Sequence, residues 1–185
     1  SNRLNIGKIR HKENILWSFA PHDISMILAI TQCQPSDVFA VGASYINRAV
    51  ADVTTTHLTF PGGQRGHIFV SWLHPYKEQK FVVVGDDGMA IFDDGQDWER
   101  KLTIYPHRVN WEQGVPTAAK AEAQPVRLTP TEPLKAECQH FVDCVADRAT
   151  PRTDGREGCR VLSVLKAAQH TLDIGEKRAR EYSAC

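Results

Sequence analysis

A histidine in the segment Trp17–Asp23 is the first candidate for chemistry in this sequence. Pro21 precedes His22 and predicts the first turn of a helix over residues 21–31. The positive end of a helix dipole disfavours the imidazolium ion, so a histidine there stays neutral near pH 7 and can take a proton from a hydroxyl group. His22 is therefore a candidate general base, with Trp17 as a candidate substrate contact. A histidine that only caps or packs the helix would give the same pattern.

A second candidate is the segment Ser71–Lys77, which gathers aromatic rings, an imidazole and an ammonium group at the end of an expected strand. Trp72 suits stacking on a sugar or a base, and Lys77 suits contact with a phosphate or a carboxylate. A solvated turn with one aromatic ring in the core explains the same composition. The segment is thus a candidate substrate-binding site.

A third candidate is the basic segment of residues 3–10, which reads as a strand or an extended arm. Alternation places Arg3 and Asn5 on one face. Lys8 and Arg10 then share the other face. Such a strand either binds an anionic substrate tail or forms a solvated edge that discourages aggregation.

These candidates must be positioned by a sheet and a few helices. Strands are expected at residues 38–46, 52–60, 66–73, 80–84, 89–92 and 101–105. Strands that follow one another without helices between them favour antiparallel pairing. The sequence predicts one α+β domain over residues 1–185, an open, mainly antiparallel sheet of about six strands covered on one face by about three helices.

The last part of the chain is expected to complete this architecture. Residues 106–131 contain four prolines and read as a long surface excursion. Two helices follow, beginning near Pro133 and Gly155. Apolar residues recur at helical spacing in both, and both stripes are expected in the core. The stripe of the first helix consists of Leu134, Cys138, Phe141, Val142 and Val145.

A sheet covered on one face leaves the other face bare, which predicts a homo-oligomer built sheet against sheet. The chain has 22 basic and 22 acidic residues, and this balance argues against a nucleic-acid or membrane partner. The five cysteines form no CxxC pair, which argues against a disulfide framework and a zinc site and favours the cytoplasm. No phosphate-binding glycine motif and no metal-ligand spacing occurs.

Several segments, in this order, resemble the C-terminal domain of the Gfo/Idh/MocA oxidoreductases. The resemblance runs from about residue 3 to about residue 175 and is greatest to the nucleotide-sugar 3-dehydrogenase branch. It is carried by the segments Arg3–Arg10, Ile15–Ser25, Phe60–Gly63, Val70–Lys77, Val83–Met89, Glu132–Phe141 and Thr150–Gly155.

The resemblance implies that this chain is the substrate-binding and oligomerisation half of a sugar dehydrogenase. An N-terminal Rossmann domain, absent from the chain, would bind NAD or NADP. The family's catalytic histidine falls on His22. Many members have Asp or Asn four residues earlier, where this chain has Ser18, so a proton relay through that position is not implied.

Two other functions fit the same residues. One is a sugar-binding or oligomerisation module with no redox partner, because the chain has no cofactor motif. The other is a family member that acts on an unphosphorylated sugar or a cyclitol. A nucleic-acid module has little support, because the charge is balanced. The chain begins with Ser1 just before an expected strand, which suggests a start inside a larger structure.

Overall fold

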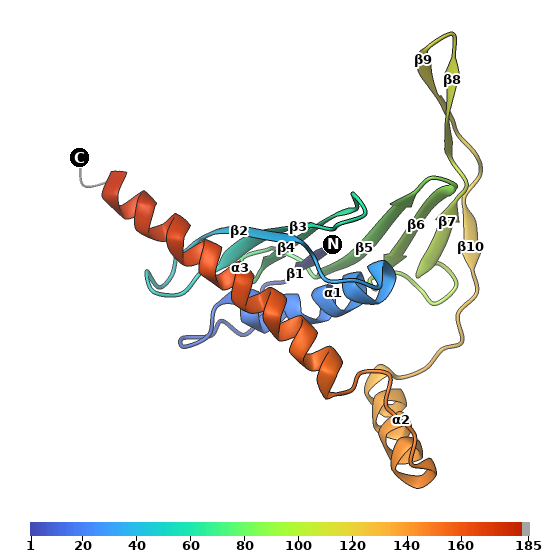
Figure 1. Cartoon of the computed structure of the whole chain (residues 1–185). Helices are drawn as coiled ribbons and strands as arrows, with labels where there is room; N and C mark the ends of the chain where they lie inside the picture. Colours follow the sequence, from blue (N-terminus) through green and yellow to red (C-terminus); the bar gives the residue numbers. More distant parts are fainter. Residues whose placement is uncertain (183–185) are drawn as a thin grey trace. The chain divides into compact units, whose positions relative to one another are not determined.

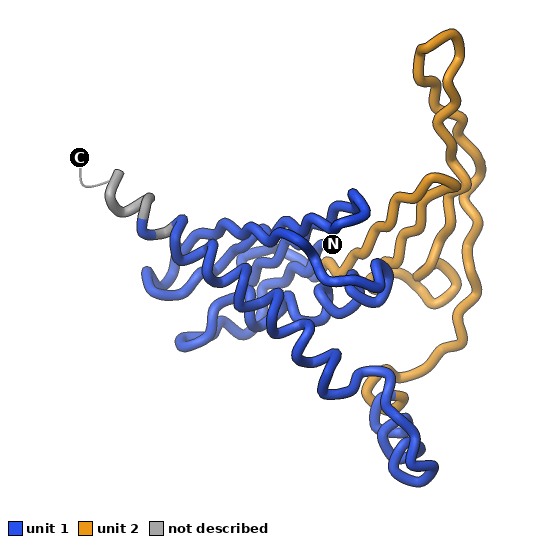
Figure 2. Tube along the Cα trace, in the orientation of Figure 1, with its two compact units in different colours: residues 1–77, 137–185 blue, residues 78–136 orange. Residues whose placement is uncertain are grey.

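The computed structural model describes residues 1–182, which form two compact units (Figure 2). The first unit joins residues 1–77 to the residues from 137 onward, and the second covers residues 78–136. No helix in the described part of the chain is long and apolar enough to cross a membrane.

Four strands form the sheet of the first unit, in the order β1-β4-β3-β2. They are β1 (Asn2–Leu4), β2 (Asp37–Ala43), β3 (Val53–Thr59) and β4 (Arg65–Ser71). β1 pairs with β4 in parallel, and the other pairs are antiparallel. Strands β3 and β4 meet at a glycine turn, where Gly63 has the positive φ of 87° that a residue without a Cβ adopts easily.

Helix α1 (Ile15–Thr31) begins six residues before the predicted start. Asn14 is its N-cap, and the Asn14 side chain accepts a hydrogen bond from the Trp17 N–H at 3.2 Å. Pro21 therefore lies inside the helix, where it has no N–H to donate to the preceding turn. The apolar positions of α1 face the sheet and are buried, among them Leu16, Ile24 and Leu28.

Helix α3 (Gly155–Tyr182) packs beside α1 and against β2 on the same face of the sheet (Figure 1). It begins where the sequence predicts, because the Asp154 carboxylate accepts the N–H groups of Arg156 and Glu157, both at 2.9 Å. Its side chains Val164, Leu165, Ala168 and Leu172 complete the core between the helices and the strands.

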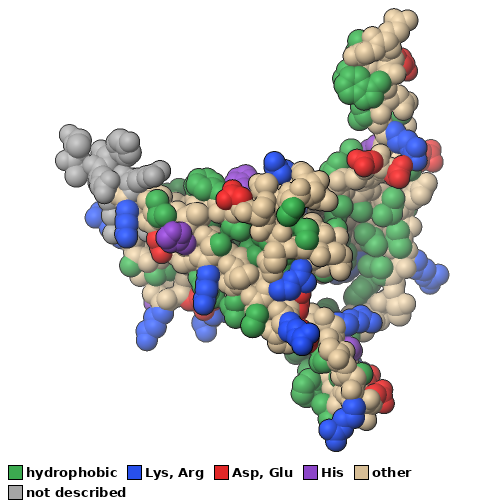
Figure 3. Space-filling view, viewed as in Figure 1, with side chains coloured by type: hydrophobic (Ala, Val, Ile, Leu, Met, Phe, Trp, Pro, Cys, Tyr) green, Lys and Arg blue, Asp and Glu red, His purple; other side chains and the backbone are tan. Residues whose placement is uncertain are grey.

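The second unit consists of antiparallel strands in the order β5-β6-β7-β10 and a separate hairpin. The strands are β5 (Glu78–Gly85), β6 (Gly88–Asp93), β7 (Leu102–Tyr105) and β10 (Gln124–Val126). None of residues 78–136 is fully buried. Figure 3 shows apolar side chains gathered over β5, β6 and β7.

The predicted surface excursion is an ordered hairpin rather than an irregular loop. It consists of β8 (Arg108–Glu112) and β9 (Val115–Ala119). Gln113 and Gly114 connect the strands, and both have positive φ angles, 51° and 80°. Two such residues form the tight turn whose twist suits a hairpin.

Helix α2 (Pro133–Asp147) begins at the predicted residue, but its apolar stripe is not in the core. Cys144 is the only buried residue of this helix, whereas Leu134 and Phe141 are 64% and 65% exposed. The α+β class and the open, mainly antiparallel sheet are confirmed, with more strands than the six expected. Burial of the α2 stripe within this chain was a wrong expectation.

Candidate functional site

His22 is the eighth of the 17 residues of α1 and is exposed to solvent. The helix begins at Ile15, so the imidazole is two turns from the positive end of the dipole. The expectation that His22 lies in the first turn is therefore wrong. The helix dipole acts only within the first turn, so it does not influence this imidazole. The imidazole makes no hydrogen bond with the described residues, so both ring nitrogens are available to a ligand.

Helical spacing places His22 on the side of α1 that faces away from the sheet. Its neighbour Asp23 is buried, and so are Ile24 and Ile27, which point to the core. Ser18 lies one turn before His22 on the outward side. The Ser18 Oγ is shielded from solvent and has no hydrogen-bond partner among the described residues. The outward side thus presents the exposed imidazole of His22, whereas the hydroxyl one turn earlier is shielded from solvent.

The carboxylate of Asp23 fixes the first strand to the helix that carries His22. Asp23 is 2% exposed and accepts a hydrogen bond from Arg3 Nε at 2.6 Å. The Ser1 hydroxyl donates to the other carboxylate oxygen. Arg3, a candidate substrate contact, is therefore an ion-pair partner of Asp23, the residue that follows His22 in the chain.

Replacing Arg3 by alanine is expected to lower the free energy of unfolding by about 2 kcal/mol, the scale of one buried hydrogen bond to a charged group. The loss leaves the Asp23 carboxylate with fewer donors in a site that water does not reach. Urea unfolding checks this value. Arg10→Ala is the control, since Arg10 is half exposed and pairs only with Glu13 at 2.8 Å.

The remaining residues of the basic segment do not share a strand. β1 ends at Leu4, so the predicted alternation does not extend past it. Asn5 donates its backbone N–H to the Ser71 carbonyl at 3.1 Å. Lys8 and Arg10 lie on an exposed loop before α1. Only Lys8 and Arg10 therefore keep the exposure that binding an anionic ligand requires.

Both candidate tryptophans are used inside the fold. Trp72 is completely buried, and its Nε1 donates to Asp52 Oδ1 at 2.6 Å. Stacking of Trp72 on a sugar is thus a wrong expectation, because no ligand reaches the ring. Trp17 is half-buried, and its Nε1 donates to Gln169 Oε1 at 2.9 Å, which joins α1 to α3.

The loop after β4 exposes a tyrosine in place of the expected tryptophan. Tyr76 is 61% exposed, and its ring lies edge-on to His74 with the centroids 4.5 Å apart. His74 Nδ1 is 2.8 Å from the Tyr76 carbonyl oxygen, a distance that suits an Nδ1–H donor. Lys77 follows and is exposed. An aromatic ring beside an ammonium group therefore remains, with Tyr76 as the ring.

Asp52 is a structural residue that the sequence did not indicate. It is 1% exposed, and its Oδ2 accepts the N–H groups of Tyr45 and Ile46 at 2.6 and 2.8 Å. Its Oδ1 accepts the indole of Trp72. A single aspartate between Ala51 and Val53 carries no spacing signal, because its partners lie up to 20 positions away.

The described residues hold no group of three or more histidine, cysteine or acidic side chains that would bind a metal ion. Gly62 and Gly63 lie in the hairpin turn between β3 and β4, and not between a strand and a helix. They do not fit the pyrophosphate of a dinucleotide, which needs a helix N-terminus after the glycines.

Comparison with known proteins finds similarity to one family of domains. Residues 6–91 match the model of the GFO/IDH/MocA C-terminal domain. The UDP-N-acetylglucosamine 3-dehydrogenase of Acidithiobacillus ferrooxidans is 26% identical over 150 residues. That alignment covers 81% of this chain and 46% of the relative, so the chain spans about half the length of the curated relative it matches.

Solved structures show the same fold. The structure of GnnA, the UDP-N-acetylglucosamine 3-dehydrogenase from A. ferrooxidans, superposes with a TM-score of 0.80 and 23% identity, covering 95% of this chain and 54% of the other. Aldose-aldose oxidoreductase from Caulobacter crescentus gives 0.67 and 18%, covering 94% and 53%. Levoglucosan dehydrogenase in complex with NADH gives 0.68 and 14%, covering 94% and 55%.

Proposed function

We propose that this chain, a C-terminal domain of the Gfo/Idh/MocA oxidoreductases, is the substrate-binding half of an NAD(P)-dependent enzyme that oxidises a nucleotide-sugar hydroxyl. The observation that carries the proposal is His22, an imidazole with no protein partner on the outward side of the first helix. It lies within the segment that matches the family model.

Oxidation of an alcohol removes a proton and a hydride. In the proposal His22 accepts the hydroxyl proton, and a nicotinamide supplied from outside this chain accepts the hydride. The neutral imidazole is the competent form, because only its free nitrogen can accept a hydrogen bond from the hydroxyl.

Recognition of the substrate is proposed for two exposed segments. Tyr76 provides a ring for a sugar face, and Lys77 provides a cation for a diphosphate. Lys8 and Arg10 are further exposed cations. Arg3 and Asn5 act in this proposal by holding β1 in place, through Asp23 and Ser71.

A homo-oligomer is proposed through the bare face of the first sheet. The strand register aligns Phe39 with His57, and His57 with His67, on the side away from the helices. Phe39 and Val41 on this side are 51% and 46% exposed. Exposed apolar side chains on the bare face of a sheet favour burial against a second copy. The described thiols are all free, which supports the cytoplasm as the location.

The test is a turnover assay on the product of the complete reading frame that encodes this chain. Appearance of NADH or NADPH is measured with UDP-N-acetylglucosamine and with free N-acetylglucosamine as the substrate. The expected result is faster turnover of the nucleotide sugar. If the complete protein has no further domain and binds the nucleotide sugar tightly without turnover, the chain is a binding module and the proposal of an enzyme is wrong.

A further inference from the structure

We propose that the apolar stripe of α2 is the surface on which a dinucleotide-binding half of the complete enzyme docks. This inference rests on the function proposed above, because it supposes that such a half exists. It goes beyond that function because it assigns to α2 the contact between this chain and the dinucleotide-binding half.

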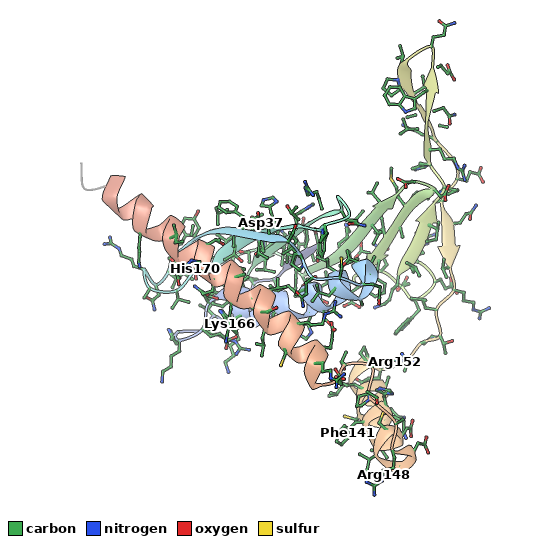
Figure 4. The ribbon with its side chains drawn as sticks, viewed as in Figure 1. Asp37, Phe141, Arg148, Arg152, Lys166 and His170 are labelled. Carbon is green, nitrogen blue, oxygen red and sulfur yellow. The ribbon has the colours of Figure 1, made fainter. Side chains whose placement is uncertain are left out.

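The stripe is continuous and exposed. Spacings of three and four residues place its five members on one side of the helix. Leu134, Phe141, Val142 and Val145 are 64%, 65%, 57% and 60% exposed, and Cys138 between them is also exposed. Figure 4 marks Phe141 on α2, and Figure 3 shows apolar side chains on the surface of this helix.

The other side of α2 already has partners. Cys144 is buried, and His140 Nε2 accepts a hydrogen bond from the Arg152 N–H at 3.1 Å at the turn toward α3. These contacts cover the side of α2 opposite the stripe and leave the stripe exposed. Isolated helices of about 15 residues are marginal in water, and most helical stability comes from packing of the apolar face. The stripe therefore needs a partner that the described residues do not supply.

The missing half of the enzyme fits this need better than a second copy does. The alignment covers 46% of the curated relative, so about half of that relative lies outside the match, and the proposed function supposes a corresponding half here. His22 faces away from the sheet on the helix side of the first unit, and the proposed reaction requires the nicotinamide on that side. α2 is joined by a short turn to the start of α3, and α3 packs beside α1, the helix that carries His22.

Cys138 is a probe built into the stripe. Its thiol is free and exposed, and Cys159, free and exposed on α3, is a matched control outside the stripe. The experiment compares maleimide labelling of the two thiols, read by peptide mass spectrometry, in the 185-residue chain and in the product of the complete reading frame.

The expected result is that Cys138 is labelled roughly tenfold more slowly, or slower still, in the complete protein, while Cys159 reacts equally in both. Phe141→Ser with Val145→Ser is expected to restore rapid labelling of Cys138 in the complete protein. Val84→Ser, a change at an exposed apolar residue of β5, is expected to leave it protected.

Equal labelling of Cys138 in both proteins would overturn the inference even if the complete protein oxidises its sugar. Protection in the 185-residue chain that rises with protein concentration would also overturn it, in favour of self-association through α2. A reading frame with no second domain would overturn both this inference and the proposed function. Turnover measured on the same preparation therefore separates the two failures.

Discussion

Replacing His22 by alanine in the complete enzyme is expected to lower the turnover number about a hundredfold, the lower end of the effect of losing a general base. The change removes the proton acceptor and leaves the fold intact, because the imidazole is exposed and makes no hydrogen bond with the described residues. KM is expected to change little, since proton transfer belongs to the transition state rather than to binding.

Steady-state kinetics with the preferred nucleotide sugar measure this loss. His11→Ala is the matched control, because His11 is an exposed histidine on the loop before α1 and has no proposed role. Thermal unfolding of both variants should match that of the unmodified protein. Unchanged turnover of His22→Ala would remove this residue from the mechanism and leave a group outside the chain as the proton acceptor.

The sequence predicts the elements of this fold better than it predicts what covers them. The α2 stripe shows why: helical spacing indicates that a face is buried, but it does not say against which partner. The start of α1 was missed for a local reason. Pro21 is typical of a first turn, whereas here Asn14 caps the helix and the interior proline is tolerated. The Gln113–Gly114 turn escaped detection because it lacks the usual Asn or Asp.

For the candidate site, too, residue type predicted some features and only the fold showed others. His22 was selected for an expected place at a helix N-terminus and for the family resemblance. The first reason is wrong, because α1 begins at Ile15, and the catalytic role of His22 stays a prediction. Trp72 and Arg3 were chosen because tryptophan and arginine often bind ligands, yet both have interior partners distant in the sequence. Residue type indicates what a side chain can bind. Only the fold shows that Trp72 and Arg3 already donate hydrogen bonds to Asp52 and Asp23 within the protein.

Replacing Asp52 by alanine is expected to lower the free energy of unfolding by about 4 kcal/mol, in the range of changes that break a buried hydrogen-bond network. The carboxylate accepts three donors, from Trp72, Tyr45 and Ile46. Its removal leaves the buried indole N–H without a partner, and each buried unsatisfied group costs about 1–3 kcal/mol. The loop between β2 and β3 loses its anchor at the same time.

Two further variants divide this effect among the donors. Trp72→Phe removes the indole N–H and leaves the carboxylate in place, so it is expected to cost less than Asp52→Ala. The double variant should cost less than the sum of the two single changes, because both break the same hydrogen bond. Urea unfolding of the four proteins measures the coupling. Strict additivity would mean that the 2.6 Å contact adds nothing to stability, and the loop contacts of Asp52 would then account for the whole loss.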